Sequence, residues 1–249
     1  MSIILKSPKE IKKMRVAGKI LNSVFKKISK EIKPGISTEE LDDLAERLIR
    51  EKRALPAFKN FRGYPKSFCI SINEEVVHGV PNPQKILKEG DIVGLDLGLK
   101  YRGYFADKTI TVPVGKISKD AKKLIRAAKK ALKKAIQEIR PGKTTGDIGF
   151  VIEKVARKNG FFVVKDLFGH GIGRQLHEEP IIPNFGKRGE GSPLREGMTF
   201  AIEPMINIGT SKVRTLKDGW TVVTADGSLS AHFEETVAVT KKGAKVLTA

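Results

Sequence analysis

The chain has 249 residues, of which 47 are Lys or Arg and 28 are Asp or Glu, so its formal net charge at pH 7 is +19. Its 40% hydrophobic residues can bury a core, which excludes a disordered chain. The single cysteine, Cys69, excludes a disulfide framework and a cysteine-rich zinc module, and it indicates a reducing compartment. We find neither a signal-peptide pattern nor about 18 consecutive apolar residues, so we expect a cytoplasmic protein that spans no membrane. The excess positive charge indicates a polyanionic partner such as nucleic acid.

The first half of the chain is expected to form two helices followed by strands. A basic amphipathic helix at about 9–33 ends before Pro34–Gly35. A second helix follows, with Ser37 or Thr38 as its N-cap. The strand-like runs come next, and they are 68–72, 92–99 and 104–112.

The second half repeats this order. A basic helix at 119–140 carries an apolar stripe, and the next helix has Thr144 or Thr145 as its N-cap. The stripe consists of Leu124, Ala128, Leu132, Ala135 and Ile139. The expected strands are 161–164, 199–206, 221–224 and 234–240. Because helices precede the strands and do not alternate with them, the pattern predicts an α+β fold with an antiparallel sheet core covered by helices.

Two distant anchors show that the halves are a repeat. Pro34–Gly35 recurs as Pro141–Gly142, and Glu89–Gly90 recurs as Glu196–Gly197, in both cases 107 residues later. At the same offset Asp96 falls on Glu203. We therefore expect two halves, about 9–115 and 119–240, related by a pseudo-twofold axis within a single domain of residues 1–249.

Four acids interrupt apolar strands, and a glycine-flanked histidine accompanies them. A single such acid is more often a strand-end residue, but unpaired buried carboxylates are costly, and four placed pairwise by the repeat indicate divalent cations among them. His170 lies in what we expect to be a Gly-rich turn, although a lone histidine is more often structural. Such an oxygen-rich set favours Mn(II), Fe(II) or Co(II), and five ligands are too many for one catalytic ion. The predicted ligands are Asp96, Asp107, His170, Glu203 and Glu234.

In order and spacing, these residues together with His78 and His177 resemble the type I methionine aminopeptidases, in their short bacterial form. The segments 69–74, 95–96, 169–180 and 201–205 carry the resemblance, which covers essentially the whole chain. It implies the pita-bread fold and removal of the initiator methionine from nascent proteins with a small second residue. It also implies two divalent ions (cobalt, manganese, iron or zinc) and a metal-bridging hydroxide as the nucleophile.

The resemblance further implies a role for each site residue. Asp107 and Glu234 would lie between the ions, Asp96 would bind one, and His170 and Glu203 would bind the other. Glu203 would also move protons, His177 would stabilise the oxyanion, and His78 would contact the scissile amide or the next residue. The methionine pocket would be lined by Phe61, Tyr64, Cys69, Leu176 and Trp220. Leu176, Phe61, Glu235 and Leu167 depart from the family pattern without removing a ligand.

Three other functions are weighed against this one. A catalytically inactive binding module of the same fold would lose ligands, whereas all five are present. Proline-type peptidases of this fold usually carry an extra N-terminal domain. A nucleic-acid-binding protein without catalysis rests on charge alone. We expect a monomer, and the basic helices 9–33 and 119–140 either dock on ribosomal RNA or are simply solvated helix faces.

Overall fold

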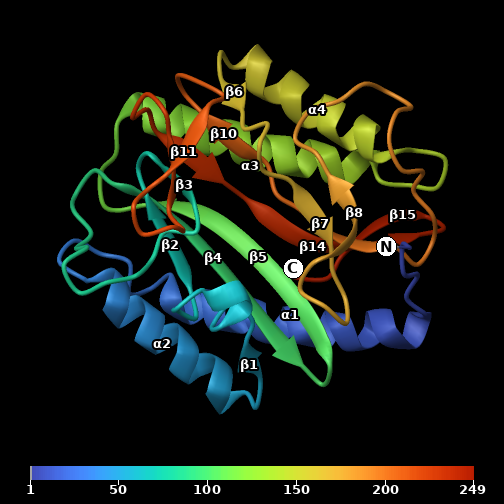
Figure 1. Ribbon diagram of the computed structural model, residues 1–249, viewed down its shortest axis with the longest axis horizontal. Coiled ribbons are helices and arrows are strands. Elements are labelled where there is room, and N and C mark those ends of the chain that lie inside the picture. Colours follow the sequence, from blue (N-terminus) through green and yellow to red (C-terminus); the bar gives the residue numbers. More distant parts are fainter. Residues whose placement is uncertain (1) are drawn as a thin grey trace.

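The computed structural model describes residues 2–249, which form a mixed α/β structure around a curved antiparallel sheet (Figure 1). Both basic helices and both following helices are present, so the prediction of helices ahead of strands is confirmed. In these residues the α-helices are α1 (Pro8–Ile28), α2 (Thr38–Glu51), α3 (Lys119–Glu138) and α4 (Thr145–Lys158). None of them is long and apolar enough to cross a bilayer.

Two helix ends differ from the prediction. The first helix ends at Ile28 and not at Lys33, because Ser29 caps it and the chain leaves the helix in a turn at residues 29–31, before the turn at Pro34–Gly35. The second basic helix ends at Glu138, and Ile139 already has an extended backbone. The apolar stripe of α3 is buried as expected, so its lysines face solvent.

The main sheet runs in the order β1-β4-β5-β14-β9-β7-β8, with β2 also paired to β4 and β15 to β14. Its strands are β1 (Leu55–Pro56), β2 (Cys69–Ile72), β4 (Ile92–Tyr101), β5 (Tyr104–Pro113), β7 (Gly169–Gly171), β8 (Glu178–Ile182), β9 (Thr199–Ile202), β14 (Glu234–Thr240) and β15 (Gly243–Val246). A three-stranded sheet has the order β13-β10-β6, with β6 (Phe162–Val163), β10 (Met205–Asn207) and β13 (Ser230–His232). Another has the order β11-β12-β3, with β3 (Glu75–Val77), β11 (Val213–Thr215) and β12 (Val222–Thr224).

The strand expected at 199–206 is divided into β9 and β10. Glu203 and Pro204 separate them, and Pro204 has no N–H to donate to a neighbouring strand. The two pieces join different sheets. As a result Glu203 lies at a break in the ladder, free of strand pairing.

The repeat is visible in the local geometry of the two halves. Ser37 caps α2 in a reciprocal capping box with Glu40, and Thr144 caps α4 in the same way with Asp147. Isolated β-bridges join Ser37 to Ile86 and Thr144 to Pro193, again 107 residues apart. These matching contacts support the pseudo-twofold relation, while the domain boundaries themselves stay a prediction.

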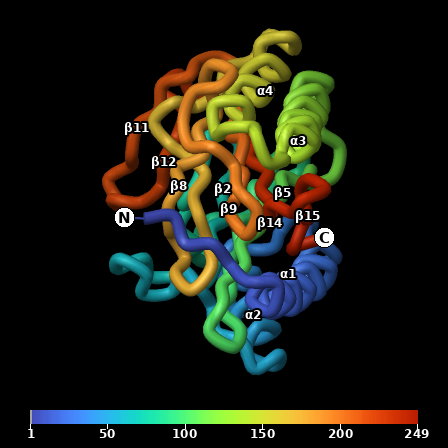
Figure 2. Tube along the Cα trace, turned by 90° about the vertical axis from the view of Figure 1, so that its right-hand side faces the viewer, coloured from blue at the N-terminus to red at the C-terminus, as the bar shows by residue number. Residues whose placement is uncertain are grey.

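Alternation along the strands separates the core from the site. On β4, Leu95, Leu97 and Leu99 pack with α1 and α2, so Asp96 points to the opposite face. On β14, Val237 and Val239 pack in the core cluster that contains α3 and α4, and Glu234 again lies on the other face. The helices therefore cover one face of the sheet, as Figures 1 and 2 show, and leave the predicted ligands on the other.

Asp42 on α2 connects this helix to the segment before β2. Its Oδ1 accepts hydrogen bonds from the N–H groups of Ser67 (2.9 Å) and Phe68 (2.8 Å). The residue is 3% exposed. Burial raises the pKa of Asp42 from 3.8 to about 6, although nearby Lys66 opposes this shift.

We predict that Asp42→Asn stabilises the protein at neutral pH. Between about pH 4 and 6 the folded protein binds more protons at Asp42 than the unfolded chain does, so its stability falls as pH rises through this window. Asparagine keeps the accepting oxygen without the charge, and should be more stable at pH 7 by up to about 2–3 kcal/mol. Urea unfolding at pH 4 and pH 7 measures this, with exposed Asp43→Asn as control. If Asp42→Asn raised the free energy of unfolding equally at both pH values, the raised pKa of Asp42 would be contradicted.

Candidate metal centre and substrate cavity

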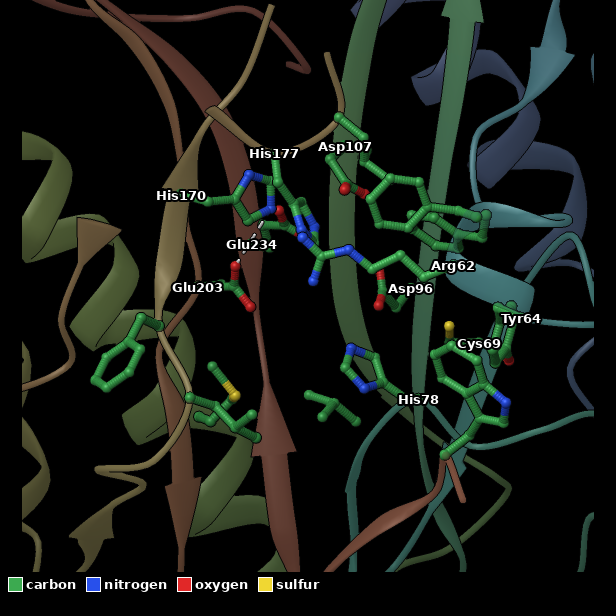
Figure 3. A pocket seen from close by; sticks show the side chains of 18 of the residues that line it. Arg62, Tyr64, Cys69, His78, Asp96, Asp107, His170, His177, Glu203 and Glu234 are labelled. Atoms are coloured by element: carbon green, nitrogen blue, oxygen red, sulfur yellow. Dashed lines mark ion pairs between the residues drawn. The ribbon is translucent and has the colours of Figure 1, made fainter. Parts of the chain in front are cut away.

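Three of the four predicted acids lie on adjacent strands of the main sheet. The register pairs Asp96 on β4 with Thr109 on β5, and Thr109 with Glu234 on β14. Asp107 lies two residues before Thr109 and therefore on the same face of β5. Thr109 Oγ1 donates a hydrogen bond to Glu234 Oε2 (2.8 Å), which fixes one oxygen of that carboxylate. Figure 3 shows the three carboxylates converging with Glu203, which follows β9.

His170 joins these acids from the opposite side of the cavity. It lies on the short strand β7, so the prediction of a turn at Gly169–His170–Gly171 is wrong. The flanking glycines instead allow close strand packing, because a Cβ at Gly169 would lie 2.5 Å from the carbonyl oxygen of Ala201. Donor atoms of Asp107, His170 and Glu234 all lie within 4.8 Å of one another.

The protonation of His170 suits a metal ligand. Its Nδ1 lies 2.9 Å from the carbonyl oxygen of Gly171, which accepts only hydrogen bonds, so Nδ1 carries the proton. Burial also lowers the pKa of His170 to about 4, which keeps the ring neutral. The free lone pair on Nε2 therefore faces the carboxylates, with Glu203 Oε1 at 3.6 Å.

Burial raises the pKa values of all four carboxylates, and neighbouring acids raise those of Asp96, Glu203 and Glu234 further. Burial raises the pKa of Asp107 to about 7. For Asp96, Glu203 and Glu234, burial first and the neighbouring acids second raise the pKa values well above those of free carboxylates. Such a cluster holds its negative charge at neutral pH only if cations compensate it.

Unsatisfied oxygens show that the cluster fits divalent cations. Within residues 2–249, Asp96 Oδ1 and Glu234 Oε1 are buried and have no hydrogen-bond donor. Buried polar atoms are nearly always paired, so oxygens without donors are suited to accept a metal ion. The set of four carboxylates and one imidazole is the donor chemistry that Mn(II), Fe(II) and Co(II) accept.

The other three histidines surround this cluster. His177 is exposed, and its ring lies edge-on to Phe61, with centroids 5.1 Å apart, and 4.1 Å from the ring of His170. Burial first, and then the neighbouring His170 and Arg62, lower the pKa of His177 to about 3, so it is a neutral donor. His78 lines the cavity and has a positive φ of 56°. Burial lowers the pKa of His78. His232, for which the sequence suggested no firm role, places its Nε2 3.5 Å from Glu203 Oε2.

All predicted site residues line one cavity of about 310 Å³. Tyr64 is fixed in its wall, because its hydroxyl donates to the carbonyl oxygens of Phe68 or Gly79, at 3.0 and 3.1 Å. Trp220 packs edge-on against Tyr64, with ring centroids 5.2 Å apart. Burial, followed by the charge of Asp96, raises the pKa of Cys69, which therefore stays a neutral thiol of the wall.

The cavity also has walls that sequence reasoning did not assign to it. Two of them, Arg62 and Val77, are direct neighbours of the predicted site residues Phe61 and His78 along the chain, and that adjacency was the available signal. Arg62, Asp166 and Phe168 are exposed and mark the mouth of the cavity, together with His177. The additional lining residues are Phe58, Arg62, Val77, Asp166, Leu167, Phe168 and Met205.

Glu235 lies beside Glu234 without entering the cavity. Lys108 Nζ lies 2.7 Å from Glu235 Oε1 and donates to the carbonyl oxygen of Thr248 at 2.9 Å. Lys108 and Glu235 are also paired in the ladder between β5 and β14. This ion pair therefore joins the two strands that carry Asp107 and Glu234.

Comparisons with known proteins show which family the chain resembles. A sequence profile described as metallopeptidase family M24 matches residues 12–241. The chain is 47% identical to methionine aminopeptidase 1 of Bacillus subtilis, covering 99% of both chains, and 44% identical to the Escherichia coli methionine aminopeptidase, covering all of this chain and 94% of the relative. The crystal structure of the Rickettsia prowazekii methionine aminopeptidase superposes with a TM-score of 0.98 at 43% identity, covering 100% of both chains.

Prolidases share the fold at lower similarity. The Pyrococcus horikoshii prolidase superposes with a TM-score of 0.79 at 28% identity, and this chain covers 63% of it. The predicted pita-bread fold is confirmed by these neighbours. On the family match and on identities above 40% over the full length, this chain belongs to metallopeptidase family M24.

Proposed function

We propose that this protein is a dinuclear, metal-dependent methionyl aminopeptidase that removes N-terminal methionine from chains with a small second residue. The observation that carries the proposal is that five potential metal ligands and an apolar wall line the same cavity. Its volume of about 310 Å³ is at the small end for ligand sites, as expected for a pocket that takes one residue. The similarity to methionine aminopeptidases at 44–48% identity supports this substrate over the proline-containing substrates of prolidases.

The metal ions would be held by Asp96, Asp107, His170, Glu203 and Glu234. Bound divalent ions lower the pKa of water and polarise a carbonyl, and the cluster offers the ligands for two of them. The substrate's free α-amine would face the carboxylates. This contact would restrict cleavage to the first residue of the substrate, as in an exopeptidase. The identity of the ions stays open between cobalt, manganese, iron and zinc.

The protein's own groups then divide the work around the scissile bond. Glu203, whose carboxylate oxygens lie 3.6 Å from His170 Nε2 and 3.5 Å from His232 Nε2, is the proposed proton carrier. The neutral His177, at the mouth, donates a hydrogen bond to the developing oxyanion. His78, on the other side of the cluster in Figure 3, is the proposed contact of the amide nitrogen or of the second residue.

The methionine side chain would occupy the apolar side of the cavity. Tyr64 and Leu176 are 3% and 2% exposed, so this wall excludes water. The Cys69 thiol and the aromatic rings give the sulfur of methionine polarisable contacts. Leucine has a different shape and no sulfur, and is therefore expected to bind less well.

A peptide panel tests the proposal. Metal-loaded protein should release methionine from Met-Gly and Met-Ala peptides, and should leave Met-Lys and Leu-Ala peptides intact. Release is followed by amino-acid analysis, with chelator-treated protein as the control. Absence of turnover with manganese, iron, cobalt and zinc would refute the enzyme, and preferential cleavage before proline would favour the prolidase alternative.

We further propose that the basic faces of α1 and α3 dock on ribosomal RNA, where nascent chains emerge. Every Lys and Arg on these two helices is exposed. Both helices cover the face of the sheet away from the carboxylates and lie on one side of the molecule in Figure 2. The positive charge is thus separate from the cavity, so docking would leave the active site accessible.

Co-sedimentation with ribosomes tests the docking. Binding should weaken at least about tenfold between low and physiological salt, because phosphate contacts release counterions. Replacing Lys122, Lys129 and Lys133 on α3 by glutamate should abolish it. The matched control replaces Lys212, Arg214 and Lys217, which are exposed around β11. Binding that is absent, insensitive to salt or equal in both triple variants would identify the faces as merely solvated.

A further inference from the structure

The segment before α1 crosses the loop that carries His177. Lys6 donates its backbone N–H to the carbonyl oxygen of Gly197 (2.7 Å), which ties this segment to the turn before β9. Its side chain forms an ion pair with Glu178 at the start of β8. Figure 2 shows the N-terminal segment passing alongside this part of the chain before it enters α1.

The ion pair is almost completely enclosed. The side chains of Lys6 and Glu178 are 1% and 3% exposed, the lowest exposure among the Lys and Arg ion pairs in residues 2–249. Lys6 Nζ also donates to the carbonyl oxygen of Ile4 (3.0 Å). A buried charge of this kind depends on its partner, because no water replaces it.

Glu178 uses its second oxygen to fix the loop itself. Oε1 accepts hydrogen bonds from the N–H groups of Arg174 (2.7 Å) and Gln175 (3.0 Å). Gly173 packs so closely that an added Cβ would overlap Lys6 Cε. One carboxylate therefore connects the N-terminal segment to the turn 173–176.

This turn sets the position of two site residues. Leu176 is buried in the cavity wall, and His177 follows it directly, against the rings of Phe61 and His170. Other contacts hold the base of the turn without Lys6, since Phe105 N–H donates to the carbonyl oxygen of Gly173 (2.8 Å) and Arg174 pairs with Glu10 (2.8 Å). Loss of Lys6 would then release the end of the turn that carries His177 and leave its base attached.

We infer that Lys6 is a positioning residue for the reaction: through Glu178 it holds the turn that places His177 over the metal cluster. Lys6 touches neither the cavity lining nor the ligands, so its effect is transmitted by the buried carboxylate. The inference rests on the proposed function, because it takes His177 as the group that acts on the scissile carbonyl. It assigns a role to a residue 172 positions away from Glu178 in the sequence.

The test is a double-mutant cycle on metal-loaded, full-length protein. Lys6→Met should lower kcat/KM for a Met-Ala peptide by about 10–100-fold, as expected when a reacting group shifts by about 1 Å. In a His177→Ala background the same change should cost no more than about twofold, because the group that Lys6 positions is gone. Lys6→Arg keeps the cation and should restore most of the loss. The matched control is Lys143→Met, which removes a lysine that lies between α3 and α4 and forms partly buried ion pairs with Glu138 and Asp147.

An activity-independent measurement separates this inference from the proposed function. Amide hydrogen exchange in the segment 173–178 should quicken at least about tenfold in Lys6→Met and stay unchanged in Lys143→Met. Wild-type protein that releases no methionine would overturn the proposed function. Hydrogen exchange would still test whether Lys6 holds the segment 173–178 through Glu178. Equal losses in both backgrounds, or unchanged exchange, would overturn the inference. If Lys6→Met does not fold, Glu178→Gln serves in its place, with the same expected pattern.

Discussion

Glutamine in place of Glu203 is expected to lower kcat/KM for methionine release by at least about 10²–10⁴-fold, the range lost with a proton-transferring group. The change keeps the size of the side chain and removes both a ligand charge and the proposed proton carrier. Burial and the charges of Asp96 and Asp107 act against the ionised form of Glu203. The metal-free variant should therefore be at least as stable as the metal-free wild type.

Thermal melts with and without Mn(II) check both parts of this prediction. Metal should raise the Tm of the wild type more than that of Glu203→Gln, because a ligand that binds only the folded state stabilises it. Exposed Glu51→Gln is the control for a neutralised glutamate. If Glu203→Gln kept a tenth or more of the activity, Glu203 would be neither an essential ligand nor the proton carrier.

Alanine in place of His177 is the second large effect that we expect. kcat should fall by about 10²–10³-fold, the usual cost of one oxyanion donor. His177 contributes no atom to the cluster of Asp107, His170 and Glu234, so the metal-induced increase in Tm should equal that of the wild type. Single-turnover kinetics on a Met-Ala peptide together with the Tm shift separate a loss of chemistry from a loss of metal.

His232→Ala serves as a comparison for His177→Ala. His232 is buried at 3% exposure and approaches Glu203, so its removal should alter metal binding as well as rate. A rate that His177→Ala leaves unchanged would refute the oxyanion role. If metal no longer raised the Tm of His177→Ala, His177 would act through the ligands.

The convergence of the candidate ligands on one face of the sheet could be predicted from the sequence, because their strands alternate regularly. Asp96 and Glu234 stand at positions where a two-residue period turns them away from the helices, and the repeat paired Asp96 with Glu203. The shape around His170 could not be predicted in this way. β7 is three residues long and pairs with β8 and β9, so tertiary packing and not local pattern makes it a strand.

The mouth of the cavity and the Lys6–Glu178 ion pair could not be predicted from the sequence, for another physical reason. Arg62 lies in a short 3-10 turn with a positive φ of 50°, a conformation that no local pattern around Phe61 indicates. The partners Lys6 and Glu178 are brought together only when the N-terminal segment packs on the finished sheet. Contacts between residues so far apart leave no periodic signal in one sequence.

Metal reconstitution tests whether the cluster of carboxylates and His170 is a catalytic metal centre. Chelator-stripped protein is titrated with Mn(II), Fe(II), Co(II) or Zn(II) under exclusion of air, and methionine release from a Met-Ala peptide is measured against bound metal. We expect no release without metal, recovery of activity with at least one of these ions, and no recovery in His170→Ala at the same metal concentration. Full activity in the stripped wild type, or recovery in His170→Ala equal to that of the wild type, would contradict this expectation.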